Sequence, residues 1–358
     1  MSKRNVPPEI TVIVSVYNVA HCVERCLSSL LAQTEGSFDL LVIDDGSTDE
    51  SAERCRRMLA GRDRTRVLSL PHSGISAVRN YGLTQVQTEY VLFVDGDDYL
   101  APDTVERLFR SVKTHSPDLV VFGFWYETEE RRGDRGDRYP VAAKKGWYGN
   151  RLALENAFPD LWDAGVLYSI CNKLFCTDLI RAHGLVLQER NFGEDFTFCR
   201  EYLRWCGTCD VLGDCCYHYV SHSENSLSAR FRADLFAIRV EEHMALIDYF
   251  STVQCQRERA EEFLARRHIE RVVGCIGNEC DRRNPADRAQ RRAHIRQMLD
   301  EPHTADCAKR ARPRSVKMKL LVLPIRMKWS GLCFAMGCVM AECRAAFPKV
   351  FLWLKMHR

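Results

Sequence analysis

Strand patterns and helix patterns alternate along the first ~120 residues, and this alternation limits most strongly how the chain can fold. Runs of β-branched and aliphatic residues, typical of buried strands, recur between stretches whose apolar residues have helical spacing. The expected strands are 10–17, 38–44, 66–70, 90–95 and 118–126. The expected helices are 20–33, 47–60, 74–86 and 102–112. This order predicts an α/β fold in which helices flank a mostly parallel central sheet.

The pattern changes after residue 126. The segment 127–140 is charged, contains glycine and has no period, so we expect an exposed loop that divides two halves of the domain. From about 232 to 300 the chain looks helical and heavily charged. We expect one α/β domain over 1–228, with a first half at about 8–126 and a second half at about 140–228, then a helical extension over 229–307 and a basic tail over 308–358.

Carboxylates gather where expected strands end. Asp44 and Asp45 follow one strand, and Asp95, Asp97 and Asp98 follow another in "VLFVDGDDYL". Ligands of open α/β sheets bind at the carboxyl ends of the strands. Like charges this close repel unless something positive lies among them, and a hard divalent cation prefers oxygen ligands. The alternative is a solvated acidic turn, with Asp44 as a strand end or helix cap and Asp98 as a turn residue.

Two common phosphate-binding motifs are missing. The first strand-to-helix turn, "VYNVAHCVERC", has no glycine fingerprint, which argues against NAD, and no GxxxxGK[ST] sequence occurs. A bound diphosphate would therefore need another positive partner. A divalent cation held by Asp97 would supply that charge.

Four segments resemble family 2 glycosyltransferases in their order and spacing. They are "VIVSVYN", "LLVIDDGSTDES", "GISAVRNYGL" and "FVDGDDYLAPD", all within residues 10–125. A looser resemblance continues through "NKLF" (172–175), "GEDFTF" (193–198) and "YHYVSHSENSLS" (217–228). The set is similar to bacterial members that build capsular, exopolysaccharide or wall glycans. The resemblance implies a GT-A glycosyltransferase domain over 1–228 with a C-terminal helical extension. Its nucleotide-binding half would be at about 8–126, and its acceptor and catalytic half at about 140–228.

The resemblance also implies residues for the nucleotide sugar. Asp45 would bind the base, and Tyr17 and Asn18 would line its pocket. Arg79 and Asn80 lie in a family motif and are expected at the same nucleotide-sugar site, without an assigned contact.

The catalytic and metal residues follow from the resemblance in the same way. Asp95 and Asp97 would form the Asp-x-Asp element, with Asp97 as the principal ligand of Mn²⁺ or Mg²⁺ and Asp95 also facing the donor. Asp195 would be the catalytic base, with Glu194 beside it. Without the resemblance, the favoured explanation for both acids is the start of a helix, where the dipole favours negative charge.

The sequence departs from the family at two places. Cys171 stands where an aromatic residue often precedes "NKL". Val220 and His222 stand where many relatives carry arginines. A protonated His222 would contact donor phosphate; the alternative is an ordinary loop histidine.

These residues together imply a metal-dependent, inverting glycosyltransferase. It would move a hexosyl or N-acetylhexosaminyl group from a nucleotide-diphosphate sugar, expected to be a UDP-sugar, to a hydroxyl of a glycan or a polyprenyl-diphosphate-linked oligosaccharide. The acceptor hydroxyl needs a base, and the departing diphosphate needs a Lewis acid. The alternatives are a nucleotidyl- or phosphoryl-transferase, and an inactive membrane-bound scaffold of the same fold.

The net charge of +3 hides a basic C-terminal segment. Residues 308–358 hold twelve Lys or Arg and one acid, Glu342, which gives 12 − 1 = +11 and leaves 3 − 11 = −8 for the rest. The longest uncharged stretch there, Trp329 to Ala341, has 13 residues, against ~20 for a transmembrane helix. Basic and apolar residues interleaved in this way favour helices that lie on an anionic membrane surface. The alternative is a basic amphipathic helix packed on its own domain; nucleic acid is not expected as a partner, because no recognised binding module accompanies the charge.

Location and redox state follow from the N-terminus and the cysteines. The start of the chain shows no basic-then-apolar leader, and the 17 cysteines are odd in number and scattered. We therefore expect a cytoplasmic protein with reduced thiols, peripheral on the inner face of the cell membrane.

Overall fold

The computed structural model describes residues 10–129, 135–190, 193–221 and 231–347. The chain divides into two compact units, Met1–Ser221 (unit 1) and His222–Arg358 (unit 2). All 17 cysteines lie in the described ranges and are free thiols, as expected.

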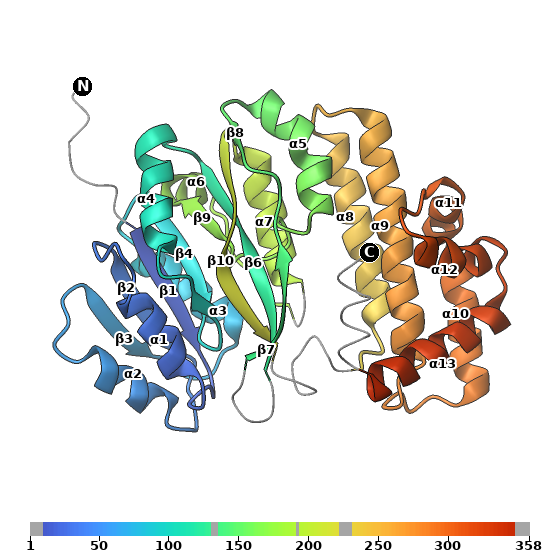
Figure 1. Ribbon diagram of the computed structural model, residues 1–358, viewed down its shortest axis with the longest axis horizontal. Helices are drawn as coiled ribbons and strands as arrows, with labels where there is room; N and C mark the ends of the chain where they lie inside the picture. The colour runs from blue at the N-terminus through green and yellow to red at the C-terminus, as the bar shows by residue number, and fades with distance from the viewer. Residues whose placement is uncertain (1–9, 130–134, 191–192, 222–230, 348–358) are drawn as a thin grey trace. The chain divides into compact units, whose positions relative to one another are not determined.

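Unit 1 is built on a ten-stranded sheet (Figure 1). The strand order is β3-β2-β1-β4-β9-β6-β10-β5, with β7 paired to β6 and β8 paired to β10. The strands are β1 Ile10–Val16, β2 Asp39–Asp44, β3 Thr65–Ser69, β4 Tyr90–Asp95, β5 Tyr99–Leu100, β6 Leu119–Glu129, β7 Arg135–Val141, β8 Gly146–Tyr148, β9 Lys173–Cys176 and β10 Cys209–Ser221. The helices are α1 Val23–Leu31, α2 Ser51–Leu59, α3 Ile75–Gln85, α4 Thr104–His115, α5 Arg151–Asp163, α6 Thr177–Ala182 and α7 Glu194–Trp205.

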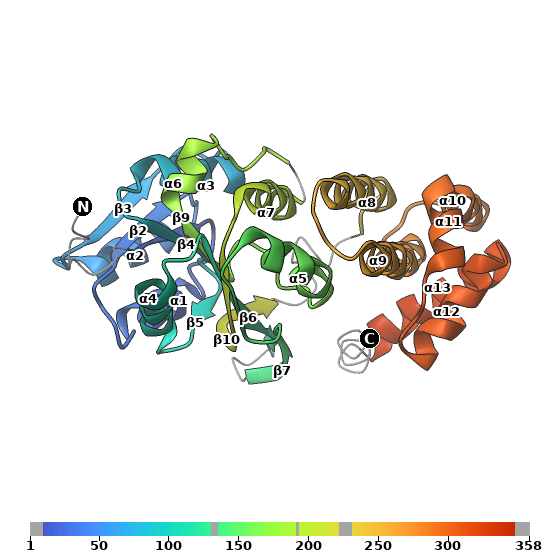
Figure 2. The ribbon, with the colours of Figure 1, turned by 90° about the horizontal axis from the view of Figure 1, so that it is seen from above.

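The predicted α/β fold is confirmed, and its sheet is mixed. Strands β3, β2, β1 and β4 pair in parallel, as β6 and β10 do, whereas β9 runs antiparallel to both β4 and β6. All seven residues of β1 are buried, which explains its continuous apolar sequence. Figure 2 shows α1 and α4 on one face of the sheet and α3, α6 and α7 on the other.

The topology places the acidic strand ends together. After β1 the chain builds β2 and β3 on one side and then crosses to β4 on the other, so the chain reverses direction beside β1. The register pairs Val16 with Asp44 and Ser15 with Asp95, which puts both acids next to the end of β1. A crevice outside such a reversal is where open α/β sheets bind ligands.

The prediction of an exposed loop over 127–140 was wrong for the described residues 127–129 and 135–140; residues 130–134 lie outside the described ranges. The described residues form the end of β6 and most of β7, which pair antiparallel with Tyr126 opposite Tyr139. Several of the charges that suggested a loop lie on these two paired strands. The Arg138 guanidinium packs over the Trp125 ring at 4.7 Å, and Glu127 accepts a hydrogen bond from Tyr99 at 2.6 Å. Charged residues can alternate with core residues on an antiparallel pair, because one of its faces remains solvated.

Unit 2 is helical in its described part. Its helices are α8 Leu235–Ser251, α9 Arg257–Glu279, α10 Arg288–Asp300, α11 Pro302–Arg310, α12 Val316–Arg326 and α13 Ser330–Ala346. Figures 1 and 2 both show α8 and α9 side by side. The predicted helical character of about 232–300 is thus confirmed. Within the described residues, no helix combines the length and the apolar character needed to cross a bilayer.

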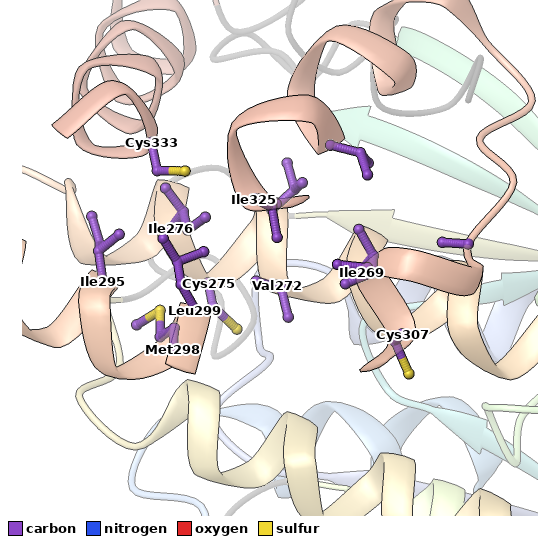
Figure 3. Close-up of a cluster of buried hydrophobic side chains, with 14 of the residues drawn as sticks. Ile269, Val272, Cys275, Ile276, Ile295, Met298, Leu299, Cys307, Ile325 and Cys333 are labelled. Atoms are coloured by element: carbon purple, nitrogen blue, oxygen red, sulfur yellow. The ribbon is translucent and has the colours of Figure 1, made fainter. Parts of the chain in front are cut away.

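The core of unit 2 forms around α9. Ile269, Val272 and Ile276 recur at helical spacing along α9 and are buried among side chains from α10 to α13, including Ile295, Ile325 and Cys333 (Figure 3). Helices α12 and α13, which lie in the basic C-terminal segment, therefore each contribute one face to this core.

Two histidines are buried between α8, α9 and α11. The rings of His243 and His268 lie 4.1 Å apart, and His268 Nε2 is 3.0 Å from the Thr304 hydroxyl. His243 Nε2 is 3.4 Å from the Cys307 sulfur. Burial, followed by the positive charge of nearby groups such as Arg271, lowers the pKa of His243 to about 3 and the pKa of His268 to about 4. Both rings are therefore neutral at pH 7.

We predict that acid destabilises the chain through these two histidines. Their folded pKa values lie below the unfolded value near 6.5, so the unfolded state binds more protons as the pH falls below about 6.5. The free energy of unfolding should decrease between pH 6.5 and pH 4, by up to about 1.4 kcal/mol per pH unit for each ring. Urea unfolding followed by circular dichroism measures this slope, and His268→Gln should make it shallower. An equal slope in His268→Gln and in the parent chain would contradict the prediction.

Candidate active site

A buried arginine joins two of the predicted site acids. Arg79 lies on α3, and its side chain is 3% exposed. Its guanidinium donates to Asp95 Oδ1 at 2.7 Å and to Asp195 Oδ1 at 2.6 Å. Burial by itself would lower the pKa of Arg79, but Asp195 and Asp95 outweigh that effect and hold the pKa well above its ordinary value. One cation therefore brings together the end of β4 and the start of α7.

Asp195 is oriented by contacts outside its own helix. Its second carboxylate oxygen accepts from the Ile170 backbone N–H at 3.2 Å. Gly193 is the N-cap residue of α7, with φ of 85°, and no side chain caps this helix. Asp195 thus stands in the first helical turn, but its carboxylate faces Arg79 and Ile170. Burial, and then the negative charge of Asp195, raise the pKa of the neighbouring Glu194.

The three acids after β4 lie in different environments. Asp95 is partly exposed, at 30% of its side chain, and its Oδ2 is 3.5 Å from the Cys171 sulfur. Asp97 is half-buried, and its backbone carbonyl accepts from Arg25 at 2.9 Å. Asp98 is fully buried and accepts from the Tyr217 hydroxyl at 2.6 Å. Burial, reinforced by Asp97 and Asp95, raises the pKa of Asp98 well above its ordinary value. Asp98 therefore anchors this turn to β10.

Asp95 and Asp97 fit a divalent cation that also binds a diphosphate. No cluster of three or more His, Cys, Asp or Glu side chains able to hold a metal occurs among the residues that the structure describes. Mg²⁺ is commonly held by one or two carboxylates plus substrate phosphates rather than by a complete protein cage. Two adjacent, incompletely buried carboxylates are a donor set of that kind.

A second site element lies at the end of β2. Asp45 is buried, and its carboxylate accepts from the backbone N–H groups of Ser73 at 2.8 Å and Gly74 at 3.0 Å. His72 Nδ1 lies 2.9 Å from Asp45 Oδ2. The Tyr17 ring stacks on the His72 ring at 4.2 Å, and both are exposed. An acceptor carboxylate beside an exposed aromatic face is a suitable arrangement for a nucleobase.

Other predicted residues connect loops of the site. Asn18 has a left-handed backbone, with φ of 52°, and its side-chain oxygen accepts from the Thr48 N–H at 2.8 Å. The Asn80 amide donates to the Leu187 carbonyl at 2.7 Å and accepts from the Leu187 N–H at 2.8 Å. Asn80 therefore fixes the segment that precedes α7. His222 lies outside the described residues.

Two neighbours of the site acids were not predicted as site residues. His72 carries no recognisable motif of its own; its only signal is its place two residues before "GISAVRN". Cys171 was noted only as a departure from the family. Its sulfur lies beside both Asp95 and Arg79, and burial raises the pKa of its thiol well above the ordinary value. Cys171 is therefore a neutral neighbour of the two charges.

Comparison with known proteins shows which family unit 1 is similar to. Residues 11–171 match the model of the family described as Glycosyl transferase family 2. The predicted resemblance is confirmed over this range, which includes the site acids Asp45, Asp95 and Asp97.

Proteins similar to this chain occur in bacteria. Glycosyltransferase GlyA of Streptococcus pneumoniae is 38% identical over 128 residues, which are 36% of this chain and 18% of GlyA. The putative glycosyltransferase EpsH of Bacillus subtilis is 26% identical over 263 residues, 72% of each chain. The uncharacterized glycosyltransferase EpsJ of the same species is 34% identical over 125 residues. The chain spans well under two thirds of GlyA and of EpsJ, with 18% and 36% of their lengths aligned.

A solved structure has the same fold. The crystal structure of S. aureus TarS residues 1–349, in complex with UDP-GlcNAc, superposes with a TM-score of 0.62 and 19% sequence identity. The superposition covers 94% of this chain and 91% of that chain. This likeness confirms the predicted GT-A fold.

We predict that Arg79 stabilises unit 1 through its two carboxylate partners. Arg79→Gln leaves Asp95 and Asp195 facing each other without a cation, which should lower the free energy of unfolding by about 3 kcal/mol. Arg79→Lys should lose less, because an ammonium keeps the charge but not the forked geometry. Arg57→Gln, which removes an exposed pair with Glu24 at 3.0 Å, is the control and should cost less than about 1 kcal/mol. Equal losses in Arg79→Gln and Arg57→Gln, measured by urea unfolding, would contradict this role.

Proposed function

We propose that this chain is a metal-dependent, inverting glycosyltransferase of bacterial surface-glycan synthesis. The donor is a UDP-sugar, and the acceptor is a hydroxyl of a glycan or of a polyprenyl-diphosphate-linked oligosaccharide. The observation that supports this proposal best is the double ion pair of Arg79. The Arg79 guanidinium lies 2.6 Å from Asp195 and 2.7 Å from Asp95, the acid that begins the Asp-x-Asp turn. It therefore holds the two acids beside each other.

Asp195 is the proposed general base. It takes the proton of the acceptor hydroxyl while the acceptor oxygen bonds to the anomeric carbon of the sugar. The bond from that carbon to the diphosphate breaks in the same step, and the nucleotide diphosphate leaves from the opposite face. A single displacement of this kind inverts the anomeric configuration. The contacts with Arg79 and the Ile170 N–H hold the base in a fixed orientation.

Asp97 and Asp95 are the proposed ligands of Mn²⁺ or Mg²⁺. When bound, the cation stabilises the negative charge that builds up on the departing diphosphate. Arg79, whose charge is kept by two carboxylates, compensates part of the negative charge at the end of β4. We place Glu194 beside the base as a second acid of the catalytic centre.

The proposed nucleotide site extends from Asp95 to the end of β2. Asp45 accepts an N–H of the uracil ring, and Tyr17 supplies an aromatic face for stacking. Asn18, Arg79 and Asn80 order the surrounding loops. The UDP-GlcNAc complex of TarS, which shares the fold, supports a uridine donor.

The proposed location is the inner face of the cell membrane. Nucleotide sugars are substrates on the cytoplasmic side, and a lipid-linked acceptor would lie in the bilayer. The basic segment 308–358 is the proposed contact with anionic lipid.

We predict that Asp195→Asn separates binding from chemistry. Asparagine keeps the shape of the side chain but cannot take a proton, so transfer should fall by about 10²- to 10⁴-fold. Donor binding in the presence of Mn²⁺, measured by calorimetry, should remain within a few-fold of the parent chain. Asp178→Asn, at a side chain 85% exposed on α6, is the matched control and should leave both quantities unchanged. Full transfer activity in Asp195→Asn would exclude Asp195 as the base.

We predict that Asp97→Ala removes the metal dependence of donor binding. Without this carboxylate the cation loses its principal protein ligand, so Mn²⁺ should no longer strengthen the binding of UDP or of a UDP-sugar. Titration calorimetry with and without Mn²⁺ measures the difference. Unchanged metal-dependent binding in Asp97→Ala would place the metal at other residues.

A further inference from the structure

Helix α12 carries apolar side chains on two opposite faces. Met318, Val322 and Ile325 point into the core of unit 2 and are buried. Val316, Leu320, Leu323 and Met327 lie on the other side, at spacings of four, three and four residues, and their side chains are 51–73% exposed. The core of unit 2 explains why Met318, Val322 and Ile325 are apolar, but it does not explain the apolar side chains on the exposed side.

Helix α13 repeats this arrangement. Cys333, Phe334 and Gly337 are buried against the core, whereas Leu332 and Val339 are 45% and 62% exposed. Between the helices Trp329 is also exposed. A groove of about 290 Å³ runs along the exposed side of α13 and is lined only by apolar side chains. Its lining residues are Leu321, Leu332, Ala335, Met336, Val339 and Met340.

We call the outward-facing apolar residues of α12 and α13, together with Trp329, the outer stripe. Its members are Val316, Leu320, Leu323, Met327, Trp329, Leu332, Ala335, Met336 and Val339. It contrasts with the exposed apolar residues of unit 1, such as Leu152 and Val186, which occur singly. Exposed apolar side chains that gather on neighbouring helices in this way mark an interaction site.

The charge around the outer stripe has one sign. No Asp or Glu occurs between Asp306 and Glu342, a stretch that contains eight Lys or Arg. Lys317 follows Val316 by one residue, and Lys319 precedes Leu320 by one residue. Because one residue is more than a quarter of a helical turn, the two lysines lie on opposite sides of the stripe on α12. Several members of this set pair with acids, among them Arg310, which contacts Asp306 and Glu261. Asp300 pairs with Lys328 at 2.8 Å, and Glu262 lies 3.9 Å from Arg314.

We propose that the outer stripe docks on an anionic lipid bilayer. The inference rests on the membrane association proposed above, and not on the transfer chemistry. The apolar side chains enter the boundary between headgroups and acyl chains, while Lys317 and Lys319 contact anionic headgroups. Trp329 has an apolar ring and a polar N–H, which suits the same boundary.

Other occupants fit the outer stripe less well. A second copy of the chain would bury the apolar side chains but bring two sets of lysines together, and like charges at an interface disfavour pairing. RNA would match the charge but would leave the apolar side chains in contact with water and phosphate. The helices, of 11 and 17 residues, are too short to span a bilayer, which leaves the interfacial position.

Vesicle flotation of the full chain tests this proposal. One set of vesicles contains phosphatidylcholine alone. The other contains phosphatidylcholine and roughly 30% of the anionic lipid phosphatidylglycerol. The parent chain should float with the anionic vesicles and bind the neutral ones at least about tenfold more weakly. The same result is expected for Asp195→Asn, so the test does not depend on transferase activity.

Three variants separate the apolar and the electrostatic contributions. Leu320→Gln with Leu323→Gln should weaken binding to anionic vesicles at least about tenfold. Lys317→Gln with Lys319→Gln should weaken it and reduce its dependence on salt. Leu152→Gln with Val186→Gln is the matched control, since these side chains are 53% and 60% exposed in unit 1, and it should bind like the parent. Circular dichroism confirms that each variant is folded.

Several outcomes would overturn the proposal. Equal binding by the Leu320/Leu323 variant and the parent would exclude the outer stripe, and loss of binding only on removal of residues 348–358 would assign the contact to that segment. Binding to RNA without binding to vesicles would identify nucleic acid as the partner. A dimer in sedimentation that the Leu320/Leu323 variant converts to a monomer, without flotation of either, would identify a second copy.

Discussion

The double ion pair of Arg79 is the interaction on which the candidate site depends. Asp95 and Asp195 come from different parts of the chain, and each would repel the other if no cation lay between them. The guanidinium has the forked geometry needed to bind both at once, and it stays charged because both partners raise its pKa. Its own burial, at 3% exposure, requires both partners. The arginine and the two acids therefore form one unit: removal of Arg79 leaves two carboxylates without their cation, and removal of either acid leaves the buried guanidinium with one partner fewer.

The sheet explains why this unit forms beside the base pocket. The chain reverses beside β1, so that the ends of β2 and β4 lie on either side of one strand. Asp45 follows β2 and orders the loop of His72 to Gly74, whereas Asp95 ends β4 and reaches Arg79. The base and the diphosphate of a nucleotide sugar correspond to these two positions in our proposal. The match of residues 11–171 to family 2 glycosyltransferases and the GT-A fold agree with this division.

The sequence predicted what local pattern encodes. The strands that end in Asp44 and Asp95 were recognised, because each is a short buried run followed by acids. The bond between Arg79 and Asp195 was not predicted, since the two residues are 116 positions apart and neither motif refers to the other. The strand β7 was missed, because its charged residues lie on a half-solvated hairpin and hide the alternation. The two apolar faces of α12 also escaped notice, since inward and outward apolar residues together leave no single amphipathic side.

The release of nucleotide diphosphate tests the central claim most directly. The purified full chain is incubated with a panel of nucleotide sugars and a lipid-linked glycan acceptor, with Mn²⁺ or with a chelator, and the released product is identified. Our account predicts that UDP is released from one UDP-sugar only when Mn²⁺ and acceptor are both present. Release of pyrophosphate or inorganic phosphate instead, or release of UDP that persists in the chelator, would contradict it.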